Sequence, residues 1–286
     1  MSKLDQIVDC LPQLLPLPEA VARAVALIQD PRSSGSQVAR VIETDQALAA
    51  KLLKLANSAF YTTRRPAASV EEALLRVGFS ITKGMLLSAA AWCMLEARDA
   101  IGPLSARRLW RHSVATAFCA RRLVSLVGGC RLEETYTAGL LHDLGSLAIA
   151  QYAPDGLAEA LRVATRGLAL FEAEREVLGF DHAEVGARLL AAWGLPDSSV
   201  EAARWHHTPT RPPSPGRLVL VAHVADSLSH LVGSYAWPQL DWHPVDREAV
   251  ESLGLGVGAV YRVVGEARSG LDGVEQLLGL ASTATA

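Results

Sequence analysis

The sequence contains few cysteines, and they form no recognisable pattern. Cys10, Cys93, Cys119 and Cys130 are scattered along 286 residues without a C-x-x-C pair. Scattered cysteines of this kind indicate reduced thiols rather than a disulfide framework. We therefore expect a cytoplasmic protein.

Long apolar runs are missing as well. No charge-free apolar stretch reaches the ~18 residues that a bilayer-spanning helix needs. Residues 1–17 include Asp5 and Asp9 and lack the basic start of a signal peptide. We expect neither a leader sequence nor a membrane span.

An excess of positive charge is also absent. Lysine and arginine total 27 against 30 acidic residues, so the formal net charge is -3. Such a chain has no strong field to hold a polyanion, which argues against nucleic-acid binding, including DNA binding by the N-terminal helices. We expect the doublets Arg64-Arg65, Arg107-Arg108 and Arg121-Arg122 to lie on solvated surfaces, the alternative being contact with phosphate.

What the sequence does contain is a globular, helix-favouring composition. Half of the residues are hydrophobic and 20% are charged, which is too apolar for a disordered chain. Alanine and leucine are abundant, while β-branched and aromatic runs are few, so the composition favours helix. No strand alternation persists for more than a few residues, and an all-α fold is therefore expected. The length of 286 residues suffices for one large domain or two small ones.

Apolar residues at helical spacing predict a first group of helices before residue 100. Residues 11–18 are proline-rich and predict an extended segment instead. Ser36, Asp45 and Ser69 are the expected N-caps, and Ser69 with Glu72 forms a capping-box pattern. The expected helices are 19–30, 36–44, 45–57, 69–78 and 80–96.

A second group follows a break at residues 100–103. Ser198 and Glu201 form another capping-box pattern within it. No flexible polar linker separates the two groups, so we expect them to pack together. The expected helices are 105–127, 133–150, 157–166, 181–193, 198–206, 216–232, 246–253 and 257–267.

The second group carries a series of histidines and aspartates, distributed over several helices. A helical bundle can bring such side chains to one interior point. Neutral imidazole and carboxylate ligands suit Fe, Mn, Zn or Ni, and the two oxygens of one carboxylate can bridge a pair of ions. The candidate ligands for one or two divalent ions are His112, His142, Asp143, His182, His206, His207 and Asp226.

The alternative for any single histidine is a surface position or a hydrogen-bonded place in the core. We assign His223, His230 and His243 to that class. No rule of helix formation places His-Asp, His and His-His in this order, yet order along the chain does not establish convergence in space.

Four tryptophans near these motifs are expected to pack the core, an aromatic wall for a nucleobase being the alternative. They are Trp92, Trp110, Trp193 and Trp205.

The stretch Ala138-Gly-Leu-Leu-His-Asp-Leu-Gly145 resembles the signature of the HD superfamily. Further segments in matching order resemble the HDOD (HD-related output domain) family over roughly residues 11–235. They are Leu15–Pro18, Asp45–Ser58, Ser69–Gly78, Trp110–Ser113, Gly179–Gly186, Trp193–Pro196, His206-His207 and Ala225-Asp226. The resemblance implies an N-terminal helical subdomain at about 11–100 and an HD-like helical bundle at about 104–235. We expect residues 236–286 to form a helical extension packed on this domain.

The resemblance also implies which residues bind metal. His142 and Asp143 match the HD doublet, and His112 matches the histidine of the preceding helix. The residues that fall where the HD-GYP cousins place further ligands are His182, His206, His207 and Asp226. Two departures argue against hydrolysis of cyclic di-GMP: Ser146 replaces a lysine common in active HD enzymes, and no Gly-Tyr-Pro motif follows His207.

For function, the resemblance implies bacterial signal transduction, often coupled to cyclic-dinucleotide networks. HDOD domains are generally regarded as regulatory or protein-interaction modules without established catalysis. The expected function is a non-catalytic output module that binds a signalling protein or a nucleotide second messenger. The alternative is a metal-dependent phosphohydrolase acting on a nucleotide or cyclic dinucleotide, with Asp143 as its catalytic residue. No receiver, GGDEF or EAL segment is recognisable, so we expect the input from another protein or a diffusible ligand.

Overall fold

The computed structural model describes residues 2–14, 18–57, 66–96, 100–101, 103–212, 214–237, 240 and 245–278. The described part is predominantly helical and contains almost no sheet, which confirms the predicted all-α fold. Its first helices are α1 (Lys3–Leu14), α2 (Glu19–Gln29), α3 (Gly35–Ile42), α4 (Gln46–Ala56), α5 (Val70–Val77) and α6 (Phe79–Glu96).

The remaining elements begin with a short antiparallel hairpin, β1 (Ala100–Ile101) and β2 (Leu104–Ser105). The helices that follow are α7 (Ala106–Val127), α8 (Leu132–Leu141), α9 (Leu144–Tyr152), α10 (Pro154–Ala164), α11 (Leu170–Leu178), α12 (His182–Ala192), α13 (Asp197–Trp205), α14 (Arg217–Leu231), α15 (Arg247–Ser252) and α16 (Val257–Leu278).

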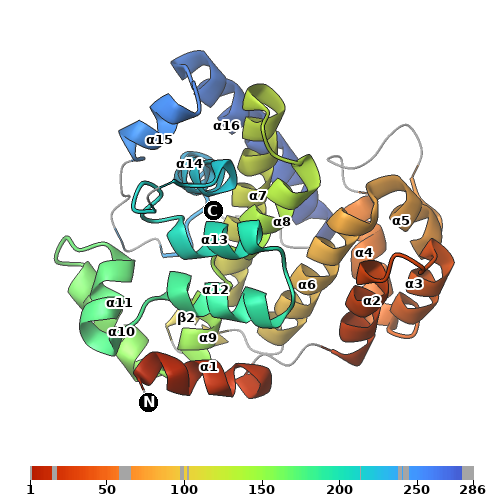
Figure 1. Cartoon of the computed structure of the whole chain (residues 1–286), viewed down its shortest axis with the longest axis horizontal. Helices are drawn as coiled ribbons and strands as arrows, with labels where there is room; N and C mark the ends of the chain where they lie inside the picture. Colours follow the sequence, from red (N-terminus) through yellow and green to blue (C-terminus); the bar gives the residue numbers. More distant parts are fainter. Residues whose placement is uncertain are drawn as a thin grey trace, which may run out of the picture.

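Helices α2 to α5 form a compact group on one side of the molecule. Figure 1 shows this group at the right, where α2, α4 and α5 contact the long helix α6. On its other side α6 contacts α7 and α8, so it connects the N-terminal group to the rest of the fold. The seam is tight, because a Cβ on Gly84 would overlap the hydroxyl of Thr137 in α8.

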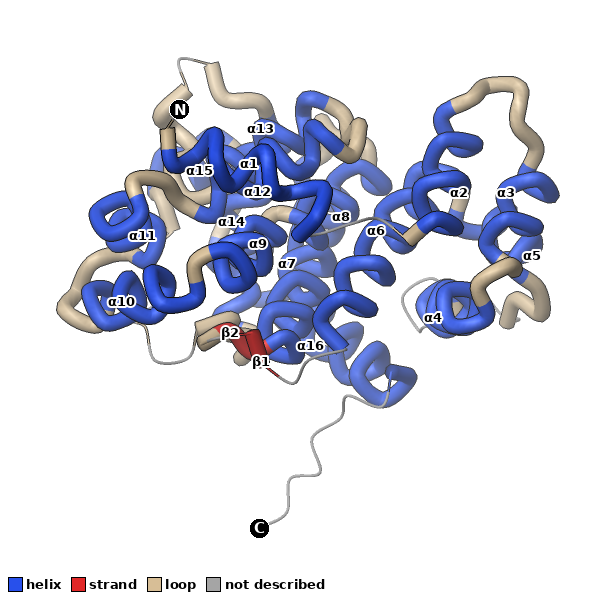
Figure 2. Tube along the Cα trace, turned by 90° about the horizontal axis from the view of Figure 1, so that it is seen from below, coloured by secondary structure: helices blue, strands red, loops and turns tan. Residues whose placement is uncertain are grey.

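Helix α7 is the centre of the second group. It contacts α8, α14 and α16, and most of its length is buried. Helix α14 is buried from Leu218 to Ser229, which explains why its sequence is apolar on all faces. Helices α9 and α12 pack against each other, while α10 and α11 form an outlying pair, seen at the left of Figure 2.

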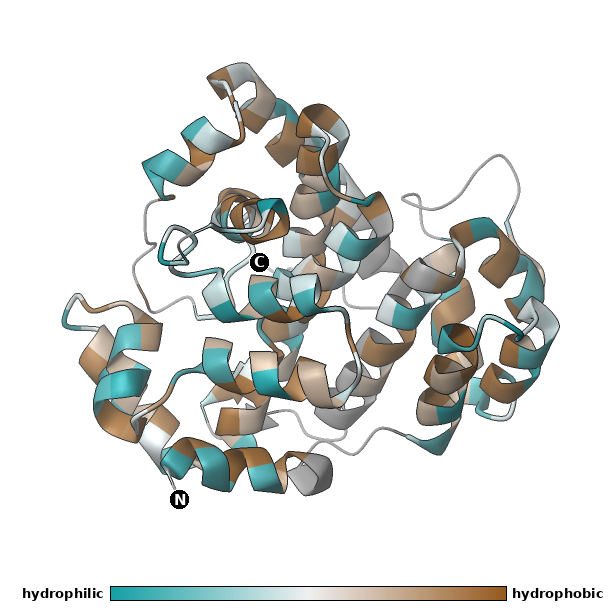
Figure 3. Cartoon of the chain, viewed as in Figure 1, coloured by the Kyte–Doolittle hydropathy of each residue, from teal (hydrophilic) through white to brown (hydrophobic). Residues whose placement is uncertain are grey.

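Helix α1 comes first in the chain but packs on the second group. Its buried residues Ile7 and Leu11 are four apart, and the helix contacts α9 and α12. The alternation of apolar and polar residues along α1 is visible at the lower edge of Figure 3. The expectation of an extended segment from residue 11 was wrong up to Leu14, because α1, held to the second group by Ile7 and Leu11, continues to that residue. Residues 15–17 lie outside the described part.

Two further predictions of helices are corrected by the structure. The helix expected at 133–150 is two helices, α8 and α9, which are interrupted at His142 and Asp143. Helix α11 was not predicted at all. Its sequence, Leu-Phe-Glu-Ala-Glu-Arg-Glu-Val-Leu, has a buried acidic residue within its apolar face.

The predicted N-caps were partly right. Asp45 accepts a hydrogen bond from the backbone N–H of Leu48, and Ser69 from that of Glu72. Helix α3 is capped by Ser34 rather than Ser36, in a complete capping box with Gln37. Ser198 does not cap α13, because its hydroxyl instead donates to the carboxylate of Glu134 in α8.

No helix in the described residues is long and apolar enough to cross a membrane.

Candidate metal centre

The candidate ligands sit at helix ends and on two buried helices. His112 lies in α7 and Asp226 in α14, and both are buried. His142 and Asp143 occupy the break between α8 and α9, so the interrupted helix turns both side chains inward. The first residue of α12 is His182, and His206-His207 directly follows α13.

One part of the centre gathers around Asp226. The Nε2 atom of His112 lies 3.0 Å from Asp226 Oδ1, and Nε2 of His142 lies 3.7 Å from the same oxygen. His112 Nε2 is also 3.7 Å from Asp143 Oδ2, which connects this part to the next. The three residues His112, His142 and Asp226 offer ligand atoms that all lie within 4.8 Å of one another, so they could hold a metal ion.

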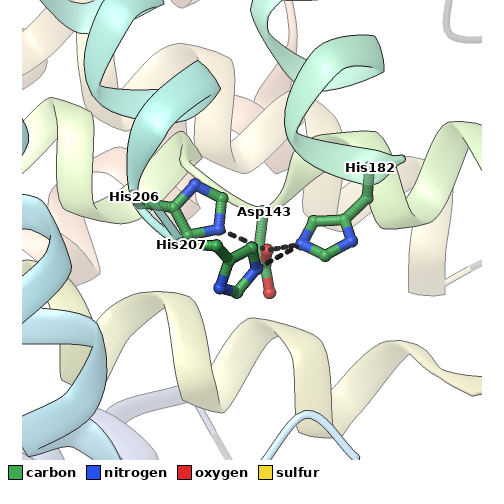
Figure 4. A group of neighbouring side chains, drawn as sticks. All are labelled: Asp143, His182, His206 and His207. Carbon is green, nitrogen blue, oxygen red and sulfur yellow. Dashed lines mark hydrogen bonds and ion pairs between the residues drawn. The ribbon is translucent and has the colours of Figure 1, made fainter. Parts of the chain in front are cut away.

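The other part gathers around Asp143, as Figure 4 shows. Asp143 Oδ1 lies 3.3 Å from His182 Nε2 and 3.6 Å from His206 Nε2. The Nε2 atoms of His182 and His207 approach each other to 2.7 Å. These four residues form a second group whose ligand atoms lie within 4.8 Å of one another.

The outer ring nitrogens of the histidines are fixed by hydrogen bonds. His142 Nδ1 donates to the carbonyl of Gly139 at 2.8 Å, and His206 Nδ1 donates to the carbonyl of Ala203 at 2.7 Å. A carbonyl can only accept, so Nδ1 carries a proton in both rings and Nε2 is the atom left to face inward. Both Nε2 atoms are buried and have no hydrogen-bond partner.

Nδ1 is fixed in the same way in two more rings. His112 Nδ1 lies 3.0 Å from the hydroxyl of Ser229 and 3.3 Å from the carbonyl of Ser234. The Ser229 hydroxyl already donates to a carbonyl, so it accepts from His112. His182 Nδ1 donates to a carboxylate oxygen of Glu174 at 2.6 Å. Four imidazoles therefore present Nε2 to one buried region.

The electrostatics keep the two carboxylates ionised. Burial raises the pKa of Asp143 and of Asp226, but the surrounding imidazoles outweigh it and hold both pKa values well below the usual range. Burial lowers the pKa of His206 and outweighs its contact with Asp143. Ionised carboxylates and a neutral imidazole are the forms that bind metal.

His182 differs from His206 in its charge state. Burial lowers its pKa, but the charge and hydrogen bond of Glu174, aided by Asp143, outweigh burial and raise the pKa to about 10. In the absence of metal the ring is therefore protonated at neutral pH. A metal ion at Nε2 would replace that proton.

The donor set fits a divalent transition metal. Orphaned Nε2 atoms on His142 and His206 and an unpartnered Oδ1 on Asp143 are buried together, where unmet hydrogen-bonding capacity is costly. Imidazole with carboxylate suits Zn, Fe, Mn or Ni. The outer hydrogen bonds are those that orient histidine ligands in metal sites.

A cavity of about 130 Å³ opens beside the centre. Its apolar lining includes Leu170 and Phe171 of α11 and Trp237 and Leu240, which follow α14. Phe171 stacks on His207 with ring centroids 4.9 Å apart. The described residues that line the cavity include no lysine or arginine.

The structure brings all seven predicted residues together, and it adds others that the sequence did not indicate. His230 was assigned to the surface or core, yet it lines the cavity with Nε2 4.0 Å from Asp226 Oδ1. Glu174 and Phe171 were missed because α11 was missed. His223 has the hydrogen-bonded core position expected for it: it donates to the His206 carbonyl and accepts from a backbone N–H. His243 lies outside the described residues.

Of the four tryptophans that the sequence singled out, the three whose side chains the structure describes do not line the cavity. Trp110 is buried, and Trp193 and Trp205 are half-buried. The side chain of Trp92 lies outside the described part, as does the doublet Arg64-Arg65. Arg107 and Arg108 are exposed, while Arg122 pairs with Glu266 of α16.

Comparison with known proteins identifies a family. The model of the HDOD domain matches residues 14–209 of this chain. A relative in Treponema pallidum (strain Nichols), an uncharacterized protein, is 29% identical over 202 residues. The match covers 70% of this chain but only 38% of that relative.

Solved structures share the fold. An HDOD domain protein of unknown function from Geobacter sulfurreducens has a TM-score of 0.73 and 23% identity, covering 96% of this chain and 98% of its own. A provisionally named phosphohydrolase from Shewanella amazonensis SB2B has a TM-score of 0.74 and 22% identity, with 96% and 98% coverage. A provisionally named signal transduction protein from Marinobacter aquaeolei VT8 has a TM-score of 0.74 and 23% identity, covering 97% of this chain and 64% of its own.

Proposed function

This chain belongs to the HDOD domain family, and on that premise we propose that it is a signal-transduction module with a metal ion or metal pair at its core. In this proposal the ligands are His112, His142, Asp143, His182, His206, His207 and Asp226. The module acts on a signalling protein or responds to a small ligand, and it does not turn over a substrate.

The observation that carries the proposal is the common orientation of the imidazoles. Four rings have Nδ1 tied to an acceptor and Nε2 directed at Asp143 or Asp226. A histidine packed only for stability needs no such agreement with three others. Convergence of this kind preorganises a metal site, because the ligands need little rearrangement when an ion enters.

A bound ion would polarise a phosphoryl or carboxyl oxygen placed in the cavity and lower the pKa of bound water. The residues of the chain supply the rest: Asp143 and Asp226 provide the negative charge that would hold the ion, and Phe171 and Trp237 contribute apolar surface to the cavity. These features suit binding of a small anionic group as well as its hydrolysis.

Two features support binding rather than turnover. Ser146 stands on α9 where active HD enzymes commonly have a lysine, and its side chain is fully buried. The described lining of the cavity offers no lysine or arginine to stabilise the charge that develops on a transferred phosphoryl group. The proposed module therefore lacks a part that phosphoryl transfer usually requires.

Metal content after purification without chelators tests the proposal. We expect one or two equivalents of Fe, Mn, Zn or Ni by mass spectrometry, and less than a tenth of that amount in Asp143→Asn. Asp155→Asn is the matched control, because Asp155 is an exposed residue of α10. Metal-free wild-type protein that also fails to take up these ions in dialysis would rule the proposal out.

The alternative function is a metal-dependent phosphohydrolase. The cavity beside the centre, with His230 and Ser227 in its lining, is the observation that favours it. Metal-loaded protein should be tested against phosphomonoesters, nucleotides and cyclic di-GMP, together with equilibrium binding of cyclic di-GMP. Turnover that disappears in Asp143→Asn would establish the enzyme, whereas binding without turnover supports the signalling module.

A further inference from the structure

Helix α11 contacts one part of the metal centre through a single face. Phe171, Glu174 and Arg175 are three and four residues apart, so they project on the same side of the helix. Phe171 stacks on His207, Glu174 contacts His182, and Arg175 forms a 2.6 Å ion pair with Asp181. Helix α11 therefore contacts both His182 and His207, whose Nε2 atoms lie 2.7 Å apart.

Glu174 is buried more completely than an ordinary helix carboxylate. Its exposed fraction is 0%, and one oxygen, Oε2, accepts both the backbone N–H of His182 at 2.9 Å and the ring Nδ1–H at 2.6 Å. The other oxygen, Oε1, is buried without a hydrogen-bond partner. Burying a carboxylate in this way is costly unless a strong partner compensates.

Capping of α12 does not account for this cost. Asp181 is the N-cap residue of α12, and its side chain accepts the backbone N–H of Glu184 at 2.7 Å. The contact of Glu174 with the ring of His182 is additional to that cap. A residue that served only to close the helix would not need to reach Nδ1.

Glu174 also distinguishes His182 from the other inward-facing histidines. The Nδ1 atoms of His142 and His206 donate to neutral carbonyls, whereas that of His182 donates to a carboxylate. A carboxylate partner makes an imidazole a stronger ligand, because it stabilises the positive charge that the ring gains on binding a cation.

We propose that Glu174 is a positioning residue that orients His182 and strengthens it as a metal ligand, an inference that rests on the metal-binding function proposed above. Glu174 itself contacts no metal. Its charge acts through the ring, and Phe171 holds the neighbouring His207 by stacking. Helix α11 thereby controls the affinity of the group made of Asp143, His182, His206 and His207.

The test is metal affinity, measured by competition with a chromophoric chelator in the metal-loaded chain of 286 residues. We expect Glu174→Gln to weaken zinc binding by about 10- to 100-fold, the range found when such partners are removed. Glu176→Gln is the matched control, because Glu176 is exposed on the same helix. The absorption spectrum of the cobalt-loaded variant should also change, since these bands report the ligand field.

A double variant separates positioning from general stability. If Glu174 acts through His182, then Glu174→Gln adds no further loss of affinity to His182→Ala. Wild-type affinity in Glu174→Gln, or a full additional loss in the double variant, overturns the inference. Should Glu174→Gln fail to fold, Glu174→Asp keeps the charge but shortens its reach, and unchanged zinc affinity in that variant also overturns the inference. Wild-type protein that is metal-free and takes up no ion in dialysis would instead refute the proposed function.

Discussion

The backbone carbonyl oxygen of His182 lies directly against Gly145. A Cβ built on Gly145 would overlap that oxygen and lie 2.6 Å from the backbone nitrogen of Gly186. The first turn of α9 can therefore approach the first turn of α12 only because Gly145 has no side chain. This contact sets the distance between Asp143, which precedes α9, and His182, which begins α12.

Gly145→Ala is expected to damage both stability and metal binding. The clash is with backbone atoms, which cannot rotate away, so α12 must shift; overpacking of this kind costs about 1–3 kcal/mol of unfolding free energy. The shift would also separate His182 from Asp143 and weaken zinc affinity. Urea unfolding and chelator competition measure the two effects.

Gly265→Ala provides the control for that experiment. A Cβ on Gly265, within α16, meets no atom within 4 Å. Replacing a helical glycine with alanine should then stabilise the protein by about 0.5–1 kcal/mol. Equal stability of Gly145→Ala and wild type would contradict the close contact between α9 and α12.

Much of this centre could be predicted from the sequence. The His-Asp doublet, the other histidines and Asp226 were identified because metal-binding residue types recur in an order that helix formation does not require. Long apolar helices such as α7 were clear from their periodicity. These features are local, and each can be recognised in a short window.

Other parts could not be predicted because they depend on tertiary contacts. The break at His142 and Asp143 lies within a continuous apolar pattern, and nothing local indicates that the helix stops there. Glu174 has the sequence context of a surface glutamate, and only its partner His182 makes it a buried residue. His230 follows Asp226 by one helical turn, and that spacing was the signal that could have indicated it.

The metal-free protein should lose stability as the pH rises above neutrality. His182 has a pKa of about 10 in the folded state, whereas an unfolded histidine titrates near ~6.5. Between these values the folded state holds a proton that the unfolded state has released, so the unfolding free energy falls with pH. His182 contributes at most about 1.4 kcal/mol per pH unit to this slope, and His112, whose pKa Asp226 and Asp143 raise against the effect of burial, adds a slope of the same sign. Urea unfolding with chelator at pH 7, 8 and 9 measures the total.

Glu174→Gln should flatten that slope, because the charge that raises the pKa of His182 is removed. Burial also raises the pKa of Cys119, but this adds a similar slope only above about pH 8.5 and does so equally in both proteins. The difference between wild type and variant is therefore diagnostic. Identical slopes from pH 7 to 8 would mean that Glu174 does not set the charge of His182.

Removal of metal should lower the melting temperature. An ion present at 100 times its dissociation constant stabilises the folded state by about 2.7 kcal/mol, which corresponds to roughly 5–10 °C for a domain of this size. Asp226→Asn should abolish most of this shift, because it removes the carboxylate nearest to His112. A chelator-induced shift of wild-type size in that variant would exclude Asp226 as a ligand.

The last prediction concerns the hydrogen bonds that connect α2 and α6 to the end of α12. The carbonyl oxygen of Gly194, just beyond α12, accepts hydrogen bonds from Lys83 Nζ of α6 at 2.8 Å and from Gln29 Nε2 of α2 at 3.0 Å. Gly194 has a φ of 66°, a left-handed conformation that favours glycine and directs its carbonyl toward the two donors. Both helices thus hold the end of the element that carries His182.

Lys83→Met is expected to lower the unfolding free energy by about 1 kcal/mol, because it removes the charged donor but keeps most of the apolar stem. Amide hydrogen exchange should accelerate at the C-terminal end of α12, because the helix end is held less firmly once the Lys83 hydrogen bond is lost. Lys54→Met is the control, since Lys54 is exposed on α4.

Combining Lys83→Met with Gln29→Ala should give a non-additive loss, because both donors share one acceptor. Additive losses together with unchanged exchange in α12 would show that the two hydrogen bonds do not act as a joint attachment of the N-terminal group.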